Sequence, residues 1–357
     1  MFAFARRIGY STESALVSSA LLAINPYFAL TGQLNLLDQG FSFFLSAALF
    51  SFVVAQVEAP QPSRSRGWMV ITWAALALAV LSKGIVALVL AGATVVAYLA
   101  FTRDFALLRR LNIAAGLPLF LLLAVPWFWL IQQRNPEFFQ FFFIREHFER
   151  FLTTVHARTG PPWYFVPLVL LALLPLIGNW NRWRLEKIES GRAAGDFRPE
   201  LFLLLWCAVV VGFFSLSESK LASYILPIMP ALAVILGRVT QEDPRAHSRA
   251  KWISVGLLVL LGTVLVAIGW YRKTWASGPA LAWGSVLVVS CLAYLVFDRL
   301  RKDLSTTQRW AALSAVSIVG YQLLAMCYAS SFPSRSASGL ASEFAGGIPA
   351  DTDLYSV

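Results

Sequence analysis

The stretch from residue 111 to residue 131 reads LNIAAGLPLFLLLAVPWFWLI and contains no charged side chain. A helix needs about 20 predominantly apolar residues to cross the roughly 30 Å hydrocarbon layer of a bilayer. This stretch has that length and composition, so it is predicted to be a membrane-spanning helix.

Similar apolar runs follow one another along the whole chain and decide its class. The chain has 357 residues, of which 58% are hydrophobic and 13% charged, and its mean hydropathy of +0.66 is too apolar for a soluble domain. The runs predict an all-α fold, a polytopic transmembrane helix bundle of about eleven spans. They lie at about 13–30, 41–57, 68–82, 84–102, 111–131, 163–180, 201–215, 222–237, 252–270, 279–297 and 310–330.

The formal charge of +10 is explained by topology. If the N-terminus is inside, the predicted inner loops hold 20 of the 29 Lys and Arg residues, and the outer side keeps nine. Cytoplasmic loops of membrane proteins carry this excess. The distribution of the basic residues therefore predicts that the N-terminus lies on the inner side of the membrane. The basic charge requires no nucleic-acid partner.

The cysteines do not indicate a metal or disulfide site. Cys207, Cys291 and Cys327 all lie inside apolar runs, without the CxxC or Cys/His spacing of a zinc site. We expect them to be packing residues.

Two charged residues at predicted outer helix ends are candidates for a site. Asp38, in GQLNLLDQG, stands where a carboxylate is costly unless it is paired or faces an aqueous cavity. It is either a solvated turn residue or a site residue that orients a polar headgroup or a cation. Lys83, in LSKG, is either a snorkelling lysine or a point charge for a lipid phosphate.

The longest outer connection, residues 132–162, contains a predicted short interfacial helix near residues 136–151. Asn135 is its expected N-cap, Pro136 its first residue, and several phenylalanines would face the headgroup boundary. Glu146, His147 and Arg150 place an acid, a titratable base and a phosphate-binding guanidinium together. The alternative is an exposed ion-pair network.

A further outer turn, SLSESKLASYILP at residues 215–227, carries Lys220 and Tyr224 one helical turn apart. We interpret both as headgroup ligands. For the domain organisation, the sequence predicts one membrane domain over residues 1–330 and a polar outer tail over residues 331–357.

These motifs occur in an order that resembles a known superfamily. NPYFALTGQLNLLDQGFSFFL is followed by LSKG, PWFWLIQQRNPEFFQFFFIREHFERF, PPWYF and FFSLSESKLASYILPIMPALA. This order, from about residue 15 to residue 238, resembles the bacterial aminoarabinose transferase and protein O-mannosyltransferase superfamily.

The resemblance implies a C-type inverting glycosyltransferase, metal-assisted or metal-free, that acts on the periplasmic side of the bacterial inner membrane. Its donor would be a polyprenyl-phosphate sugar carrying aminoarabinose, mannose or another hexose, and its acceptor a lipid A, a glycan or a protein. By the same resemblance, Lys83, Arg150 and Tyr224 match positions that bind the lipid phosphate. Glu146 and His147 match the border of the sugar pocket, and Asp38 lies near the site.

The sequence departs from the family pattern at its start. Family members carry a catalytic acidic pair in a first outer loop that precedes everything seen here, so we expect an N-terminally incomplete chain without the main general base. Asp38 is then the candidate substitute. The alternatives are a transporter or flippase of lipid-linked sugars, and a catalytically inactive fragment that still binds lipid phosphate.

Overall fold

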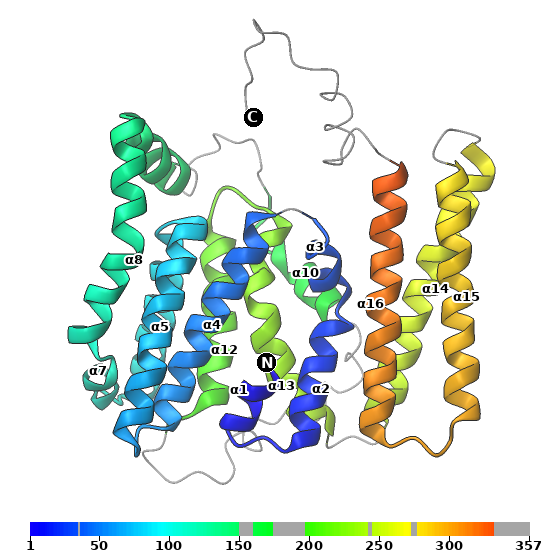
Figure 1. Ribbon diagram of the computed structural model, residues 1–357, viewed down its shortest axis with the longest axis horizontal. Helices are drawn as coiled ribbons and strands as arrows, with labels where there is room; N and C mark the ends of the chain where they lie inside the picture. Colours follow the sequence, from blue (N-terminus) through cyan, green and yellow to red (C-terminus); the bar gives the residue numbers. More distant parts are fainter. Residues whose placement is uncertain (35, 150–159, 174–196, 242–244, 273–276, 332–357) are drawn as a thin grey trace, which may run out of the picture. The chain divides into compact units, whose positions relative to one another are not determined.

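The computed structural model describes residues 1–34, 36–149, 160–173, 197–241, 245–272 and 277–331. These residues form helices joined by short turns (Figure 1). The elements are α1 Phe2–Arg7, α2 Thr12–Ala23, α3 Pro26–Thr31, α4 Leu37–Val57, α5 Pro62–Lys83, α6 Val86–Thr102, α7 Ala106–Arg110, α8 Ile113–Arg134, the π-helix η1 Gln140–Glu149, α10 Phe165–Ala172, α12 Pro199–Leu216, the 3₁₀-helix η3 Ala222–Ile228, α13 Met229–Gln241, α14 Ala246–Arg272, α15 Ser277–Leu300 and α16 Thr306–Ser331.

The predicted all-α membrane fold is confirmed. Seven of the described helices, α4, α5, α8, α12, α14, α15 and α16, are long and apolar enough to cross a membrane. Shorter apolar helices lie at Thr12–Ala23, Val86–Thr102 and Ala222–Arg238, where the sequence predicted three further spans. The predicted run at 163–180 contains α10, and its remainder from residue 174 lies outside the described residues.

The predicted run at 13–30 is divided into two helices by its own sequence. The Asn25 side chain accepts a hydrogen bond from the Phe28 N–H at 3.0 Å and so caps α3. Pro26 occupies the first position of α3, where its missing N–H costs nothing. The same proline disfavours a continuation of α2, because it lacks the N–H that a helix interior uses and its ring crowds the preceding turn.

The chain forms two compact units, Met1–Ala250 and Lys251–Val357. In the first unit α4 packs against its neighbour α5, and α2 packs against α13 (Figure 1). Gly237 of α13 makes the second contact close, because a Cβ there would meet the Ser18 backbone nitrogen at 2.7 Å. The division at Ala250 falls inside the predicted domain 1–330, and the predicted tail beyond residue 331 lies outside the described residues.

The second unit packs α15 against α16, and α14 approaches α15 through two glycines. A Cβ at Gly284 would lie 2.8 Å from the Gly262 carbonyl oxygen, so only small residues allow this approach. Asp298 accepts hydrogen bonds from Lys251 at 2.6 Å and from Arg309 at 2.9 Å, which links the ends of the three helices.

A helix lies in the predicted outer connection, but its start and its type differ from the prediction. Asn135 ends α8 as its C-cap instead of starting a new helix, and the backbone N–H of Asn135 bonds the Ile131 carbonyl. The Gln132 side chain holds the following turn, donating to the Pro136 carbonyl and accepting from the Phe139 N–H. The helix η1 therefore begins at Gln140 and is a π-helix.

The phenylalanines of this region pack on one another as well as facing outward. Phe138 and Phe142 stack with ring centroids 5.1 Å apart, and both lie against Phe128 of α8. Phe139 and Phe141 remain more than half exposed, as expected for residues at a membrane boundary.

Candidate functional site

The ends of α4 and α5 bring together two of the predicted site residues. Asp38 lies in the first turn of α4 and Lys83 in the last turn of α5, and their side chains form an ion pair. A carboxylate is stabilised at a helix N-terminus and an ammonium group at a C-terminus by the helix dipoles. Each charge is therefore favoured by its own helix as well as by its partner.

Aromatic rings surround the Lys83 ammonium group. Its Nζ lies 4.4 Å from the ring centroid of Tyr224, 5.4 Å from that of Phe41 and 6.0 Å from that of Phe214. Phe214 and Tyr224 also pack on each other, with centroids 4.6 Å apart. The Lys83 side chain is 21% exposed, so the cation is held in place but remains accessible.

The second oxygen of Asp38 is engaged by the 3₁₀-helix η3. The Ser223 hydroxyl donates to Asp38 Oδ2, while Lys83 donates to Oδ1. The Tyr27 hydroxyl of α3 donates to the Ala222 carbonyl, which ties the start of η3 to α3. Asp38 therefore joins α4, α5 and η3.

Lys220 lies in the loop just before η3, and only 7% of the residue is exposed. Its Nζ donates to the Ser215 carbonyl at 3.0 Å and to the Ser217 carbonyl at 2.6 Å. These bonds close the loop upon itself. Since an ammonium group has three donors, one N–H remains beyond these two bonds.

The remaining predicted residues belong to the outer helix. Glu146 lies in η1 and is half-buried. His147 also lies in η1, but its side chain is outside the described part, and Arg150 lies outside the described residues altogether. Their predicted roles stay predictions.

The described residues do not form a cation site. Among them, no three His, Cys, Asp or Glu side chains converge. At Asp38 both carboxylate oxygens accept hydrogen bonds, one from Lys83 and one from Ser223.

Three residues of the site were not predicted, namely Ser223, Phe41 and Phe214. Phe41 follows Asp38 by three positions, the spacing of one helical face, and this signal was available in the sequence. Ser223 stands directly before Tyr224, but hydroxyl residues are so common in this turn that the sequence could not single it out. Phe214 precedes the turn as one of many apolar residues.

The polytopic helical bundle has the fold of the C-type membrane glycosyltransferases to which it is similar. Residues 1–142 match the family described as dolichyl-phosphate-mannose-protein mannosyltransferase. The structure is similar to the crystal structure of ArnT from Cupriavidus metallidurans bound to undecaprenyl phosphate, with a TM-score of 0.82 and 28% identity over 100% of this chain and 65% of that one. The resemblance to the aminoarabinose transferase and protein mannosyltransferase superfamily is thereby confirmed.

Two curated relatives carry the same description, undecaprenyl phosphate-α-4-amino-4-deoxy-L-arabinose arabinosyl transferase. The protein of Aeromonas hydrophila is 30% identical over 66% of this chain and 43% of its own length. The protein of Serratia proteamaculans is 29% identical over 89% of this chain and 57% of its own length. The chain thus spans about half the length of these relatives.

Proposed function

We propose that this chain forms the part of a membrane glycosyltransferase that binds the phosphate of a polyprenyl-phosphate sugar donor. The observation that carries the proposal is the Lys83 ammonium group, held by Asp38 and surrounded by three aromatic rings at a helix end. Such a group offers a fixed positive charge with N–H donors for an anionic headgroup. The relatives are undecaprenyl phosphate-aminoarabinose transferases, and the similar crystal structure contains bound undecaprenyl phosphate, whose headgroup is such an anion.

The proposed chemistry follows from where charge develops. An acceptor hydroxyl oxygen attacks the anomeric carbon, the bond from that carbon to the phosphate oxygen breaks, and the hydroxyl proton passes to a base. Negative charge grows on the polyprenyl phosphate as it leaves. Lys83 would stabilise this charge more in the transition state than in the ground state, which is what accelerates the reaction.

Asp38 acts in this proposal as a positioning residue for Lys83, in place of the catalytic base considered from the sequence. Both of its oxygens accept hydrogen bonds, one from the Lys83 ammonium group and one from the Ser223 hydroxyl. These two bonds fix the carboxylate against Lys83 and η3. Tyr224 and Lys220 complete the phosphate site, with Arg150 as a further predicted ligand.

The acceptor is proposed to be a lipid A, a glycan or a protein, and the active face to be periplasmic. The orientation rests on the excess of Lys and Arg in alternate loops, which places the Asp38–Lys83 end outside. The sugar is aminoarabinose, mannose or another hexose.

A binding assay tests the phosphate site without requiring turnover by a chain of this length. Undecaprenyl phosphate is titrated into the purified chain in detergent, and Lys83→Met is compared with Lys302→Met, a control at an exposed loop position. We expect Lys83→Met to weaken binding by about tenfold, the effect of losing one charge-assisted hydrogen bond, and Lys302→Met to leave it unchanged. Equal binding by all three proteins would refute the assignment.

A transfer assay tests the reaction itself. Membranes that contain the chain, or a version extended upstream, receive a radiolabelled polyprenyl-phosphate sugar, and label is followed into lipid, glycan and protein fractions. Transfer that disappears in Lys83→Met supports the proposal. Movement of labelled donor across vesicle membranes without transfer would favour the flippase alternative instead.

A further inference from the structure

A second cationic site lies at the opposite end of α4 and α5. A pocket of about 470 Å³ opens there, lined by Arg7, Glu58, Arg64, Gly67, Trp68 and Ile71. Glu58 follows the last residue of α4, and α4 has 21 residues. At 1.5 Å per residue this helix separates the pocket from Asp38 by about 30 Å, so the pocket is distinct from the proposed donor site.

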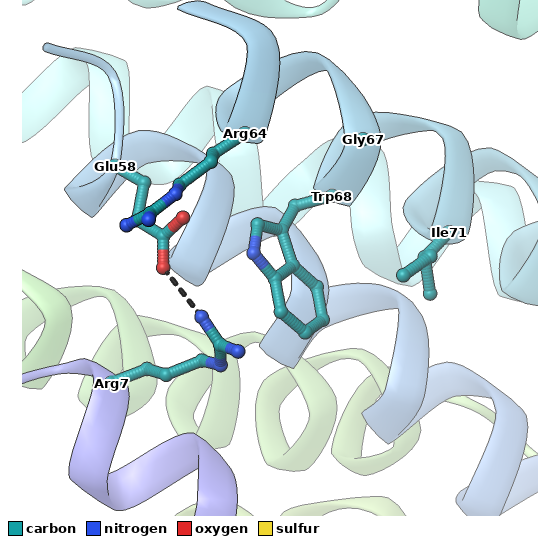
Figure 2. Close-up of a pocket in the computed structure, with 6 residues that line it drawn as sticks. All are labelled: Arg7, Glu58, Arg64, Gly67, Trp68 and Ile71. Carbon is teal, nitrogen blue, oxygen red and sulfur yellow. Dashed lines mark hydrogen bonds and ion pairs between the residues drawn. The ribbon is translucent and has the colours of Figure 1, made fainter. Parts of the chain in front are cut away.

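The charges of this pocket are arranged to hold an anion. Arg7 donates to Glu58 at 2.8 Å, and its guanidinium carbon lies 4.8 Å from the centroid of the Trp68 ring (Figure 2). Arg64 reaches the same pocket, and within the described residues it has no hydrogen-bond or ion-pair partner. Two guanidinium groups therefore face one carboxylate, and Arg64 keeps its donors for a ligand.

Beyond the pocket, exposed apolar side chains continue along the same face of α5. Ile71 is 47% exposed, and Leu78, two turns further along the same helix, is 37% exposed. Both lie within the candidate membrane span Pro62–Lys83. A ligand with a phosphate at Arg64 could thus extend an acyl chain over Ile71 and Leu78.

Gly67 keeps the pocket open. A Cβ built at this position meets no atom within 4 Å, and its backbone is helical. Any side chain at residue 67 would project into space that the glycine leaves free. The position therefore offers a way to fill the pocket without disturbing the packing of α5.

We propose that this pocket binds the phosphate headgroup of an anionic membrane phospholipid, with Arg64 and Arg7 as the phosphate ligands and Trp68 at the headgroup level. Basic pockets at the ends of transmembrane helices bind such headgroups, and tryptophan is enriched at that depth. A soluble phosphate compound would use the two arginines but not the apolar track of Ile71 and Leu78. The site does not depend on the function proposed above.

Native mass spectrometry of the purified chain in detergent tests the proposal with phosphatidylglycerol, phosphatidylcholine and inorganic phosphate as probes. We expect phosphatidylglycerol to bind at least about tenfold more tightly than phosphatidylcholine, and Arg64→Gln and Gly67→Phe each to weaken it by about tenfold. Arg66→Gln is the matched control, because Arg66 is exposed on the same helix turn but does not line the pocket. It should change binding by no more than about twofold.

Three results would overturn the proposal. Equal losses in Arg64→Gln and Arg66→Gln would show unspecific attraction to a basic loop. Unchanged binding in Gly67→Phe, with the same melting temperature as the wild type, would place the lipid elsewhere. Displacement of phosphatidylglycerol by an equimolar amount of inorganic phosphate would assign the pocket to a soluble anion.

Discussion

The Asp38–Lys83 ion pair predicts a specific pattern in a double-mutant cycle. The two side chains are 13% and 21% exposed, so the pair lies between a buried and an exposed one. Removing one partner of a buried pair costs about 3–5 kcal/mol, whereas an exposed pair contributes about 0–1 kcal/mol. We therefore expect Asp38→Asn and Lys83→Met each to cost about 2 kcal/mol of unfolding free energy.

The double variant Asp38→Asn/Lys83→Met shows whether the two single costs arise from one shared interaction or from two independent ones. With both charges removed, neither charge is left without its partner, and the double variant should again lose about 2 kcal/mol of unfolding free energy. The two single costs sum to about 4 kcal/mol, so the coupling energy between the residues has a magnitude of about 2 kcal/mol. The free energy of unfolding can be measured by titrating the four proteins with SDS in mixed micelles. Undecaprenyl phosphate binding, measured on the same samples, should stay weak in the double variant because Lys83 is absent.

Additive losses of unfolding free energy in the double variant would contradict a coupled ion pair. If the double variant loses about 4 kcal/mol, the two residues act independently and Asp38 does not hold Lys83. If instead the double variant regains donor binding together with stability, the lysine is not the phosphate ligand. These outcomes test the ion pair and the proposed function separately.

Two further predictions concern contacts of the described structure, and a third concerns the orientation in the membrane. Ser223→Ala should lower the free energy of unfolding by about 1–3 kcal/mol, because it removes a donor to the Asp38 carboxylate. Ser219→Ala should leave the free energy of unfolding nearly unchanged, because the buried Ser219 hydroxyl has no hydrogen-bond partner among the described residues. SDS titration compares the two variants. Gly237→Ala should lower the free energy of unfolding by about 1–3 kcal/mol, since its Cβ would lie 2.7 Å from the Ser18 nitrogen. The control Gly92→Ala, with open space around it, should change the free energy of unfolding by less than about 1 kcal/mol. Equal melting temperatures of the two variants would contradict the close α2–α13 contact. A cysteine at Gln61, in the exposed turn between α4 and α5, should react with an impermeant maleimide only in inverted vesicles and a cysteine at Arg134 only in intact cells, and the reverse would overturn the proposed orientation.

The sequence predicted the helices of this fold well because membrane-spanning runs carry a strong signal. The uncharged run 111–131, for example, corresponds to one helix, α8 at Ile113–Arg134. The prediction was least accurate where polar side chains bond the backbone locally. At Asn135 the sequence pattern of an N-cap was present, yet Gln132 stabilises a turn there and the residue ends α8.

The site was predicted in part, for reasons that differ between residues. Asp38, Lys83 and Tyr224 were selected because charged or polar side chains at helix ends in a membrane protein are costly and so call for partners. That Ser223 is one of those partners depends on how η3 turns after residue 221, and no periodic pattern encodes that direction. The pocket at Arg7 and Arg64 was not predicted, because each arginine alone had been explained by the charge bias of the inner loops.

The pairing of Asp38 with Lys83 follows from helix lengths that can be counted in the sequence. The two residues are 45 positions apart. Asp38 lies at the start of α4 and Lys83 at the end of α5, which are the ends opposite the turn that connects these two antiparallel helices. Since α4 has 21 residues and α5 has 22, the second helix returns to the level at which the first begins. Nearly equal lengths therefore place the two charges at one depth, and the contact between the helices brings them together. The same geometry places Glu58 beside the start of α5, so one helical hairpin supports both the proposed donor site and the proposed lipid site at its two ends.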